Sequence, residues 1–377
     1  MRILIDGRFI GVGESISRYT LEIVQGILKL DQEHEYTLLI RPQGEKFIAD
    51  NLQLKAKNFR TKVLDIPHYS FKEQTELLKY LNSEKFDLVH FTQFNHPIRY
   101  KGNYVISVHD LTLLGHLHRM NIVKRLGFRA VMKSAIMDSR KIITISNTTK
   151  DDLVETYRID PDKIAITYLG VDNKYNSNFK SQSASWRTKI RDFKEKYKTG
   201  EKYILYTGMW KRHKNLLRMF DAFERAKLSD VKLVLVGKID KEEPEILKRI
   251  DEINSKQKII VTTGFVEEEE LPIAYAGAVA YCIPSLSEGF GLPPLEAMAC
   301  GTPVISSAVS AMPEILGKAA FYFDPYDIED MSMAMKTIVE DEKLQKELSQ
   351  KGLKWVARYD WEKTAKETLD VYKSLLK

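Results

Sequence analysis

Two glutamates flank a glycine-rich turn in the segment SEGFGLPPLEAMACGTP. Gly289 and Gly291 can expose several backbone N–H groups before a helix that we expect to begin near Leu292, and helix N-termini attract phosphate. Glu288 and Glu296 would repel a phosphate, but they accept hydrogen bonds from neutral hydroxyls. The combination predicts a sugar-nucleotide site, with the hexose near one carboxylate and the ribose near the other. A solvated surface helix carrying two glutamates is the alternative interpretation.

A cluster of basic side chains follows the predicted strand YILYTG. Arg212, His213 and Lys214 stand directly before an amphipathic segment, LLRMFDAFERA. The positive end of a helix dipole disfavours cations, so the cluster is best explained by an anion bound between them. A solvated basic loop is the alternative. The position after a strand favours anion binding, because ligands of open α/β sheets bind at the carboxyl ends of strands.

A second candidate pair follows the predicted strand YVISV. His109 could donate a hydrogen bond to a phosphate or a sugar hydroxyl, and Asp110 could cap the next segment. A purely structural histidine is an equal alternative. The acidic residues of DPD at 160–162 lie between a helix and a strand, which predicts a turn rather than a metal site.

Two common nucleotide-binding motifs are excluded by spacing. Gly11 and Gly13 follow the first strand, but the third glycine of G-x-G-x-x-G would fall on Ile16. The sequence also contains no G-x-x-x-x-G-K-[ST] motif. Only Cys282 and Cys300 are present, too few for a disulfide framework or a structural zinc site, and we expect no metal or cofactor.

The elements that must position these residues alternate regularly along the chain. Short β-branched runs such as ILID, YTLLI, KIITIS, KLVLVG and AVAYCIP alternate with longer amphipathic segments. Nearly continuous apolar strands predict parallel sheets covered on both faces, and two such series predict two doubly wound domains. The polar stretch within 173–200 interrupts the pattern and is the expected linker.

Size and charge limit the possible partners. A chain of 377 residues, 44% of them hydrophobic, is longer than a single hydrophobic core usually supports. We therefore expect two domains. Residues 51–150 hold 17 Lys or Arg against 7 Asp or Glu, whereas residues 251–350 hold 6 against 17. The basic half favours an anionic partner, and the acidic stretch argues against nucleic acid. The opening MRILID is typical of a buried strand rather than a signal peptide, so we expect a cytoplasmic protein.

The segment 121–141 predicts a helix with one basic face. Arg125, Arg129 and Lys133 recur at four-residue spacing, with apolar side chains on other faces. Such a helix could lie on an anionic membrane surface and bring a lipid-linked acceptor within reach. A solvated face of a core helix is the alternative interpretation.

Together these motifs resemble the family 4 retaining glycosyltransferases of GT-B fold, particularly their mannosyltransferase-like branch. The resemblance rests, in order along nearly the whole chain, on IDGRFIGVGESISRYT, VISVHDLTLL, KIITISNTTKDDL, ITYLGVD, LYTGMWKRHKNL, LVLVGK, TTGFVEEEELPIAYAGA and PSLSEGFGLPPLEAMACGTPVISS. It implies two Rossmann-like domains facing a deep interdomain cleft. The implied domains are an acceptor-side domain of residues 1–172 plus 361–377, including a C-terminal helix, and a donor-binding domain of residues 173–360.

The resemblance also implies a role for each site residue. Glu288 would bind hydroxyls of the transferred sugar, Lys214 helped by Arg212 would neutralise the leaving diphosphate, and His109 would touch the donor from the opposite domain. Glu296 would accept hydrogen bonds from the ribose. The implied donor-binding residues are Gly13, Gly208, Phe265, Val266, Gly289, Phe290, Gly291, Leu292 and Glu296.

The function implied by the resemblance is hexose transfer from a nucleotide diphosphate sugar, GDP-mannose or a UDP-sugar, to a glycan or lipid-linked glycan. The family has no settled carboxylate nucleophile, which favours front-face attack without a metal. A non-catalytic sugar-nucleotide-binding protein and a GT-B epimerase are the alternatives.

The chain departs from many relatives at four positions, one of which is Leu169, where they carry Asn. Met209 stands where they carry Arg, and Ser15 and Ser17 stand where they carry glycine. Arg212 could compensate for the lost arginine from the same loop.

Overall fold

The computed structural model describes residues 1–12, 14–52, 56–115, 117, 121–176, 184–238 and 243–376. The chain forms two compact units, Met1–Gly170 with Asp360–Lys377, and Val171–Tyr359. The stretch 173–200 therefore belongs to the second unit. No described helix is long and apolar enough to cross a membrane.

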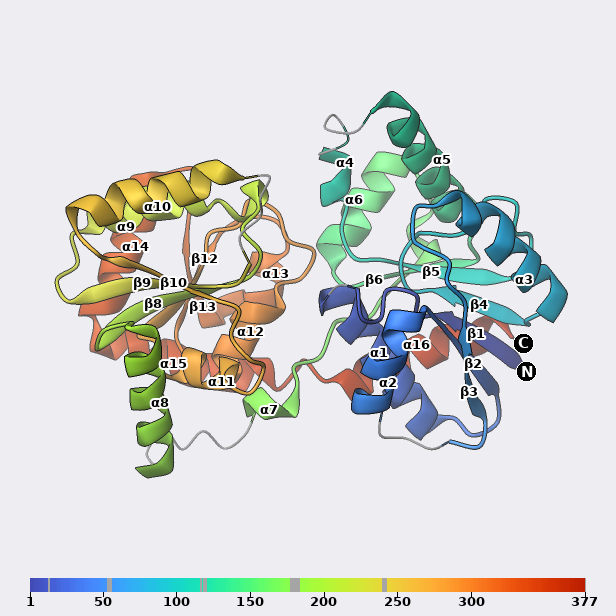
Figure 1. Cartoon of the computed structure of the whole chain (residues 1–377), viewed down its shortest axis with the longest axis horizontal. Coiled ribbons are helices and arrows are strands. Elements are labelled where there is room, and N and C mark those ends of the chain that lie inside the picture. Colours follow the sequence, from blue (N-terminus) through green and yellow to red (C-terminus); the bar gives the residue numbers. More distant parts are fainter. Residues whose placement is uncertain are drawn as a thin grey trace. The chain divides into compact units, whose positions relative to one another are not determined.

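The first unit is built on a seven-stranded parallel sheet with the order β3-β2-β1-β4-β5-β6-β7 (Figure 1). Its strands are β1 Arg2–Asp6, β2 Glu35–Ile40, β3 Phe59–Val63, β4 Leu88–Phe91, β5 Tyr104–Val108, β6 Lys141–Thr144 and β7 Ile164–Ile166. Its helices are α1 Glu14–Leu30, α2 Pro42–Asn51, the π-helix η1 Glu73–Leu77, α3 Leu78–Glu84, α4 Thr112–Gly115, α5 Ile122–Asp138, α6 Asn147–Tyr157, the 3-10 turn η3 Pro161–Lys163 and α16 Trp361–Leu375.

The second unit is built on a six-stranded parallel sheet with the order β10-β9-β8-β11-β12-β13 (Figure 1). Its strands are β8 Lys202–Thr207, β9 Val231–Val236, β10 Ile260–Gly264, β11 Ala280–Ile283, β12 Val304–Ser307 and β13 Ala320–Phe323. Its helices are α7 Asn173–Asn176, α8 Ala184–Tyr197, η4 Arg212–Lys214, α9 Leu216–Ala226, α10 Pro244–Lys256, α11 Leu271–Ala276, α12 Leu292–Ala299, α13 Met312–Leu316, η5 Gly317–Ala319, α14 Ile328–Glu340 and α15 Glu342–Val356.

Helices cover both faces of each sheet, which explains the unbroken apolar runs of the central strands. In the second unit α9, α10 and α14 lie on one face, and α8, α11, α12 and α15 lie on the other (Figure 1). The middle strands β5, β8 and β11 are almost wholly buried. The expected α/β class with two doubly wound, Rossmann-like domains is confirmed.

The C-terminal helix α16 packs against α1 in the first unit. The contact is close because a Cβ at Gly26 would lie 2.3 Å from the Ala365 Cβ. Where the chain enters α16, a Cβ at Gly170 would lie 2.1 Å from the backbone nitrogen of Trp361. The last residues therefore complete the first unit through two positions that only glycine can occupy.

Two edge strands, β3 and β13, are missing from the sequence expectations. β3 has the sequence FRTKV, and three of its five residues are exposed. Edge strands of this kind lack the continuous apolar pattern by which central strands are recognised. The predicted helix start at Leu292 is confirmed, because α12 begins there.

Candidate active site

The candidate site lies at the switch point of the second sheet. Its strand order runs outward in both directions from β8 and β11, which are neighbours. At such a point the connections after the two strands turn to opposite faces and leave a crevice at their carboxyl ends. The loop after β8 carries the basic cluster, and the loop after β11 carries the glutamate motif. Parallel pairing of the two strands therefore brings both sequence motifs to one edge of the sheet.

An ion pair joins the two loops. The Lys214 Nζ donates to both oxygens of Glu288, at 2.7 and 2.9 Å. The two side chains are 20% and 14% exposed, so the pair is largely shielded from water. The Ser285 hydroxyl donates to Glu288 Oε1 at 2.6 Å. Burial raises the pKa of the Glu288 carboxyl, but the Lys214 charge and these hydrogen bonds outweigh burial, and the net pKa is lowered.

Backbone contacts fix the glutamate loop in place. The Leu286 N–H donates to the His213 carbonyl at 2.8 Å, which ties the two loops together. The Glu288 N–H donates to Ser310 Oγ at 3.1 Å, and the Ser310 hydroxyl donates back to the Glu288 carbonyl at 2.8 Å. Glu288 is thus held through its backbone as well as its side chain, which limits its freedom to change position.

The glycines of the motif shape the N-terminus of α12. Gly291 is the N-cap residue with φ 95°, and a Cβ there would lie 2.6 Å from Met312. Phe290 between the glycines is buried and packs edge-on against Tyr359, with ring centroids 5.6 Å apart. Gly291 supplies no side-chain cap, and the two prolines after Leu292 carry no N–H, so the Leu292 N–H is the backbone donor at the electropositive first turn of α12.

Glu296 lies on the buried side of α12. Its carboxylate accepts a hydrogen bond from the Tyr275 hydroxyl at 2.9 Å. The same hydroxyl is 2.9 Å from Thr207 Oγ1, at the last residue of β8. The second glutamate is therefore connected to the strand end that precedes Lys214, although Glu296 itself is only 6% exposed.

Three glycines lie at the carboxyl ends of the neighbouring strands β8, β9 and β10, where they present no side chain. Gly208 and Gly237 have φ values of 141° and 139°, a region open mainly to glycine. A Cβ at Gly237 would lie 2.0 Å from the Gly208 carbonyl oxygen. The third glycine is Gly264, which directly precedes Phe265. The Gly237 N–H donates a hydrogen bond to the Gly264 carbonyl at 3.0 Å.

The remaining predicted donor-side residues differ in exposure. Phe265 is 54% exposed, and the Lys238 ammonium lies 5.7 Å from its ring centroid. Val266 is buried. Arg212 is exposed on the same turn as Lys214 and makes no ion pair with any described residue. The structure thus places Phe265 and Arg212 where solvent or ligand can reach them.

Comparison with known proteins decides the family. A profile described as Glycosyltransferase Family 4 matches residues 16–175, and one described as Glycosyl transferases group 1 matches residues 188–355. The O-antigen chain mannosyltransferase RfbU of Salmonella typhimurium is 30% identical over 269 residues, covering 71% of this chain and 69% of the relative. The chain belongs to the family 4 glycosyltransferases.

Other relatives extend the match over the whole glycosyltransferase. O-antigen chain mannosyltransferase B of Escherichia coli is 25% identical over 379 residues, 96% of each chain. The solved sucrose-phosphate synthase of Thermosynechococcus elongatus superposes with a TM-score of 0.77 at 18% identity, covering 100% of this chain and 99% of that one. The structural likeness establishes the GT-B fold. The protein is a glycosyltransferase that uses a nucleotide sugar.

The first unit of the glycosyltransferase holds His109 in a fixed orientation. Its Nε2 lies 3.0 Å from the Thr92 carbonyl, so the ring N–H at Nε2 donates to that oxygen. Tyr19 packs edge-on at 4.7 Å between centroids. Burial lowers the pKa of His109 more than the Thr92 carbonyl and Asp110 raise it, which favours the neutral ring.

The neighbouring loop after β1 is held by one of the unusual serines. The Ser17 hydroxyl donates to the Phe9 carbonyl at 2.8 Å and accepts from the Gly11 N–H at 3.1 Å. Ser17 is 3% exposed, whereas Ser15 faces solvent. Ser17 therefore fixes the loop by hydrogen bonding. Gly13 lies outside the described residues.

Sequence reasoning missed several polar residues that support the glycosyltransferase site. These residues are Ser285, Ser310 and Tyr275, of which Ser285 lies in the same sequence motif as Glu288. Their contribution depends on contacts between elements distant in sequence, and isolated serines and tyrosines give no pattern for it. The DPD turn is as predicted: the Asp160 carboxylate accepts from the Asp162 N–H at 2.9 Å. No metal-binding cluster of three or more ligands occurs among the described residues.

Proposed function

We propose that this chain is a retaining hexosyltransferase that moves a hexose from a nucleotide diphosphate sugar to a growing glycan. The observation that carries the proposal is the Lys214–Glu288 pair at the switch point of the second sheet. It places a cation for the diphosphate beside a carboxylate for sugar hydroxyls, in the loop that leads to the N-terminus of α12. Two relatives named mannosyltransferases support mannose as the hexose, with GDP-mannose ahead of a UDP-sugar as donor.

The geometry of the pair supports electrostatic help to the leaving group. An ammonium has three N–H groups, and Glu288 accepts from two directions, which leaves one for a phosphate oxygen. Arg212 on the same turn adds a second cation, which is exposed. As the glycosidic bond to the diphosphate breaks, negative charge grows on that group, and fixed cations stabilise it more than they stabilise the ground state. No metal ion is required in this proposal.

The state of Glu288 argues against a double displacement. Lys214 and Ser285 both bind its carboxylate, and its pKa is lowered, so it is a weakened nucleophile. We favour front-face attack, in which the acceptor hydroxyl bonds to the anomeric carbon on the side from which the diphosphate leaves. An oxygen of the departing diphosphate takes the proton of the hydroxyl. Glu288 then binds the sugar and balances charge.

The proposed acceptor is a glycan or lipid-linked glycan of a surface polysaccharide, since the two relatives are named for the O-antigen chain. We further propose a cytoplasmic enzyme that docks peripherally on anionic lipid through α5. Ile122, Val123 and Leu126 on this helix are 62%, 76% and 58% exposed, next to the basic side chain of Arg125. Exposed apolar and basic side chains on one helix favour an interfacial position.

Membrane docking is tested by sedimentation with anionic vesicles. The triple variant of the basic stripe, Arg125→Ala, Arg129→Ala and Lys133→Ala, should bind more weakly than the native chain, and salt should weaken native binding. Equal and salt-insensitive partitioning of both proteins would contradict the docking proposal, without affecting the reaction.

The reaction is tested with purified protein, an acceptor extract and a panel of GDP, UDP and ADP sugars. Binding of the right donor should raise Tm by mass action, and transfer should release the nucleoside diphosphate. The Lys214→Ala change should lower kcat by about 100-fold or more, the usual effect of removing one group that stabilises transition-state charge. Lys211→Ala in the same loop is the matched control and should keep near-native turnover.

The outcomes separate the alternative functions. NMR coupling constants of the product should show the donor anomer retained. Binding with neither release of nucleotide nor change of the donor would indicate a non-catalytic sugar-nucleotide-binding protein, and conversion of the donor into its epimer without transfer to acceptor would indicate an epimerase. Loss of activity in EDTA would overturn the metal-independent mechanism.

A further inference from the structure

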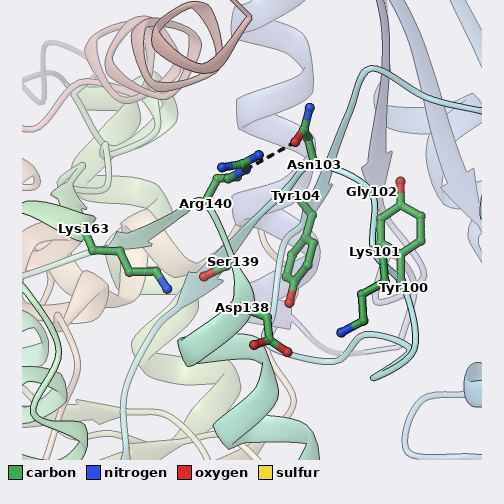
Figure 2. Close-up of a pocket in the computed structure, with 9 residues that line it drawn as sticks. All are labelled: Tyr100, Lys101, Gly102, Asn103, Tyr104, Asp138, Ser139, Arg140 and Lys163. Carbon is green, nitrogen blue, oxygen red and sulfur yellow. Dashed lines mark hydrogen bonds between the residues drawn. The ribbon is translucent and has the colours of Figure 1, made fainter.

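An open groove of about 470 Å³ lies in the first unit, at the edge of the sheet opposite His109. Tyr104 begins β5 at the groove, and His109 follows the other end of that strand. Five strand residues span about 16 Å, so the groove is separate from the strand ends that carry the candidate site. Lys101, Asn103, Asp138, Ser139, Arg140 and Lys163 contribute to its lining (Figure 2).

Positive charge dominates this groove. Lys101, Arg140 and Lys163 face a single carboxylate, Asp138, which already accepts a hydrogen bond from the Ser134 hydroxyl at 2.9 Å. Lys101 is exposed and makes no ion pair or hydrogen bond with any residue in the described parts of the chain. Like charges brought together at the cost of mutual repulsion favour an anionic ligand between them.

Two of the cations are held in position by the protein. The Arg140 Nε donates to Asn103 Oδ1 at 3.3 Å, as Figure 2 shows, and its backbone N–H donates to the Tyr104 carbonyl at 2.9 Å. The half-buried Lys163 ammonium donates to the Ile136 and Met137 carbonyls, both at 2.7 Å, where α5 ends. These contacts use two of the three ammonium N–H groups, so one remains for a ligand.

Ser139 is the second and independent indication of a ligand. The residue is only 4% exposed, and its buried hydroxyl has no hydrogen-bond partner among the described residues. In the view of Figure 2 this hydroxyl lies between Lys163 and Asp138 at the groove. Buried hydroxyls are nearly always paired, so an unpaired one in the lining of a basic groove is best explained as a donor to a bound acceptor.

We propose that this groove binds a phosphate group, either free or as the headgroup of an anionic lipid. Lys101 and Arg140 supply charge from the open side, while the third N–H of Lys163 and the Ser139 hydroxyl donate from the inner side. A phosphate has several acceptor oxygens and can meet donors from more than one direction, which a carboxylate does less well. Since the groove is away from the strand ends, the bound phosphate anchors or regulates the protein and takes no part in transfer.

The test is calorimetric titration of the whole chain with inorganic phosphate. The double variant Lys101→Ala/Arg140→Ala removes two exposed cations without touching the core, and Lys46→Ala/Lys79→Ala removes two exposed lysines elsewhere in the first unit as a charge-matched control. Each protein is also prepared with the additional Lys214→Ala substitution, which weakens phosphate binding at the candidate active site of the second unit. Comparison of the two sets separates phosphate bound there from phosphate bound in the groove. In both backgrounds the groove variant should weaken binding about tenfold or more, as loss of charge-assisted contacts predicts, and the control should not.

A separate arm identifies the source of the phosphate. Vesicles of phosphatidic acid in phosphatidylcholine carry the same phosphomonoester on a lipid. If the groove variant weakens vesicle binding relative to the charge-matched control, the phosphate belongs to a headgroup; if it weakens only the titration, the ligand is free phosphate. The Ser139→Ala change should weaken whichever binding is found. Binding of phosphate and vesicles by the groove variant at the level of the control would overturn the proposal.

Discussion

The Lys214→Met substitution tests whether the buried ion pair has the energetic role that its geometry implies. It removes the ammonium but keeps a long apolar side chain of similar reach. Glu288, which is 14% exposed in the native chain, would keep the hydrogen bond from the Ser285 hydroxyl but lose its cation. It would then be close to an uncompensated buried charge. Breaking a pair of this kind costs about 3 kcal/mol at neutral pH. For a domain of this size that corresponds to a fall in Tm of about 6 to 12 °C.

The pH dependence of this loss follows from the sign of the Glu288 shift. In the native chain its pKa is lowered, so the pair contributes fully above the ordinary glutamate value of about 4.3 and is lost as pH falls through the lowered pKa. Without Lys214, burial alone raises the pKa, and the carboxyl becomes protonated in the folded state at higher pH. The difference in Tm between the two proteins should therefore shrink as pH falls from 7 toward 4.

Scanning calorimetry of a double-mutant cycle measures the pairwise contribution. Lys214→Met, Glu288→Gln and the double variant are compared with the native chain, with Lys211→Met as control. We expect a coupling free energy of about 2 kcal/mol at pH 7, typical of contacting residues that share a network. Additive losses, or a Lys214→Met loss that is the same at pH 7 and pH 4, would refute the reasoning.

Three further predictions concern positions outside this pair. Ser17→Ala removes both hydrogen bonds that hold the loop after β1 and should lower the stability of the first unit by about 1 to 2 kcal/mol, measured by urea unfolding; an unchanged midpoint would contradict the assigned role. Gly237→Ala would place a Cβ 2.0 Å from the Gly208 carbonyl oxygen and should lower the free energy of unfolding by about 2 to 4 kcal/mol. The measurement is the fall in Tm, which added donor sugar nucleotide should not restore. Burial lowers the pKa of His90 to about 3 and of His96 to about 4, so the folded chain resists protonation and stability should fall as pH drops below about 6.5, by up to ~3 kcal/mol per pH unit for the two residues. A Tm that is flat between pH 7 and pH 5 would show that these rings accept protons in the folded state.

Much of the fold follows from local sequence pattern. Continuous apolar strands alternating with amphipathic segments require sheets covered on both faces, and this requirement is enough to predict two doubly wound domains. The edge strand β3 escaped prediction because an edge strand is only partly buried, and its side chains need not be apolar. The start of α12 at Leu292 was predictable because glycine and proline mark a helix start locally.

The sequence by itself determined which chemical groups the site contains. Glu288, Lys214 and the glycines between 289 and 291 stand in motifs whose residue types already indicate an anion and a polyhydroxyl ligand. That information is local, because each motif directly follows a recognisable strand.

Only the tertiary structure decided how these groups act on one another. Lys214 and Glu288 are 74 positions apart, and their contact depends on β8 and β11 being neighbours in the sheet order. The direction of the Glu288 pKa shift likewise depends on burial competing with that contact, and neither quantity can be read from residue identity. The hydrogen bonds of Ser17 and the basic groove at Ser139 were also decided only by the tertiary structure. Hydrogen bonding and burial are properties of the packed chain.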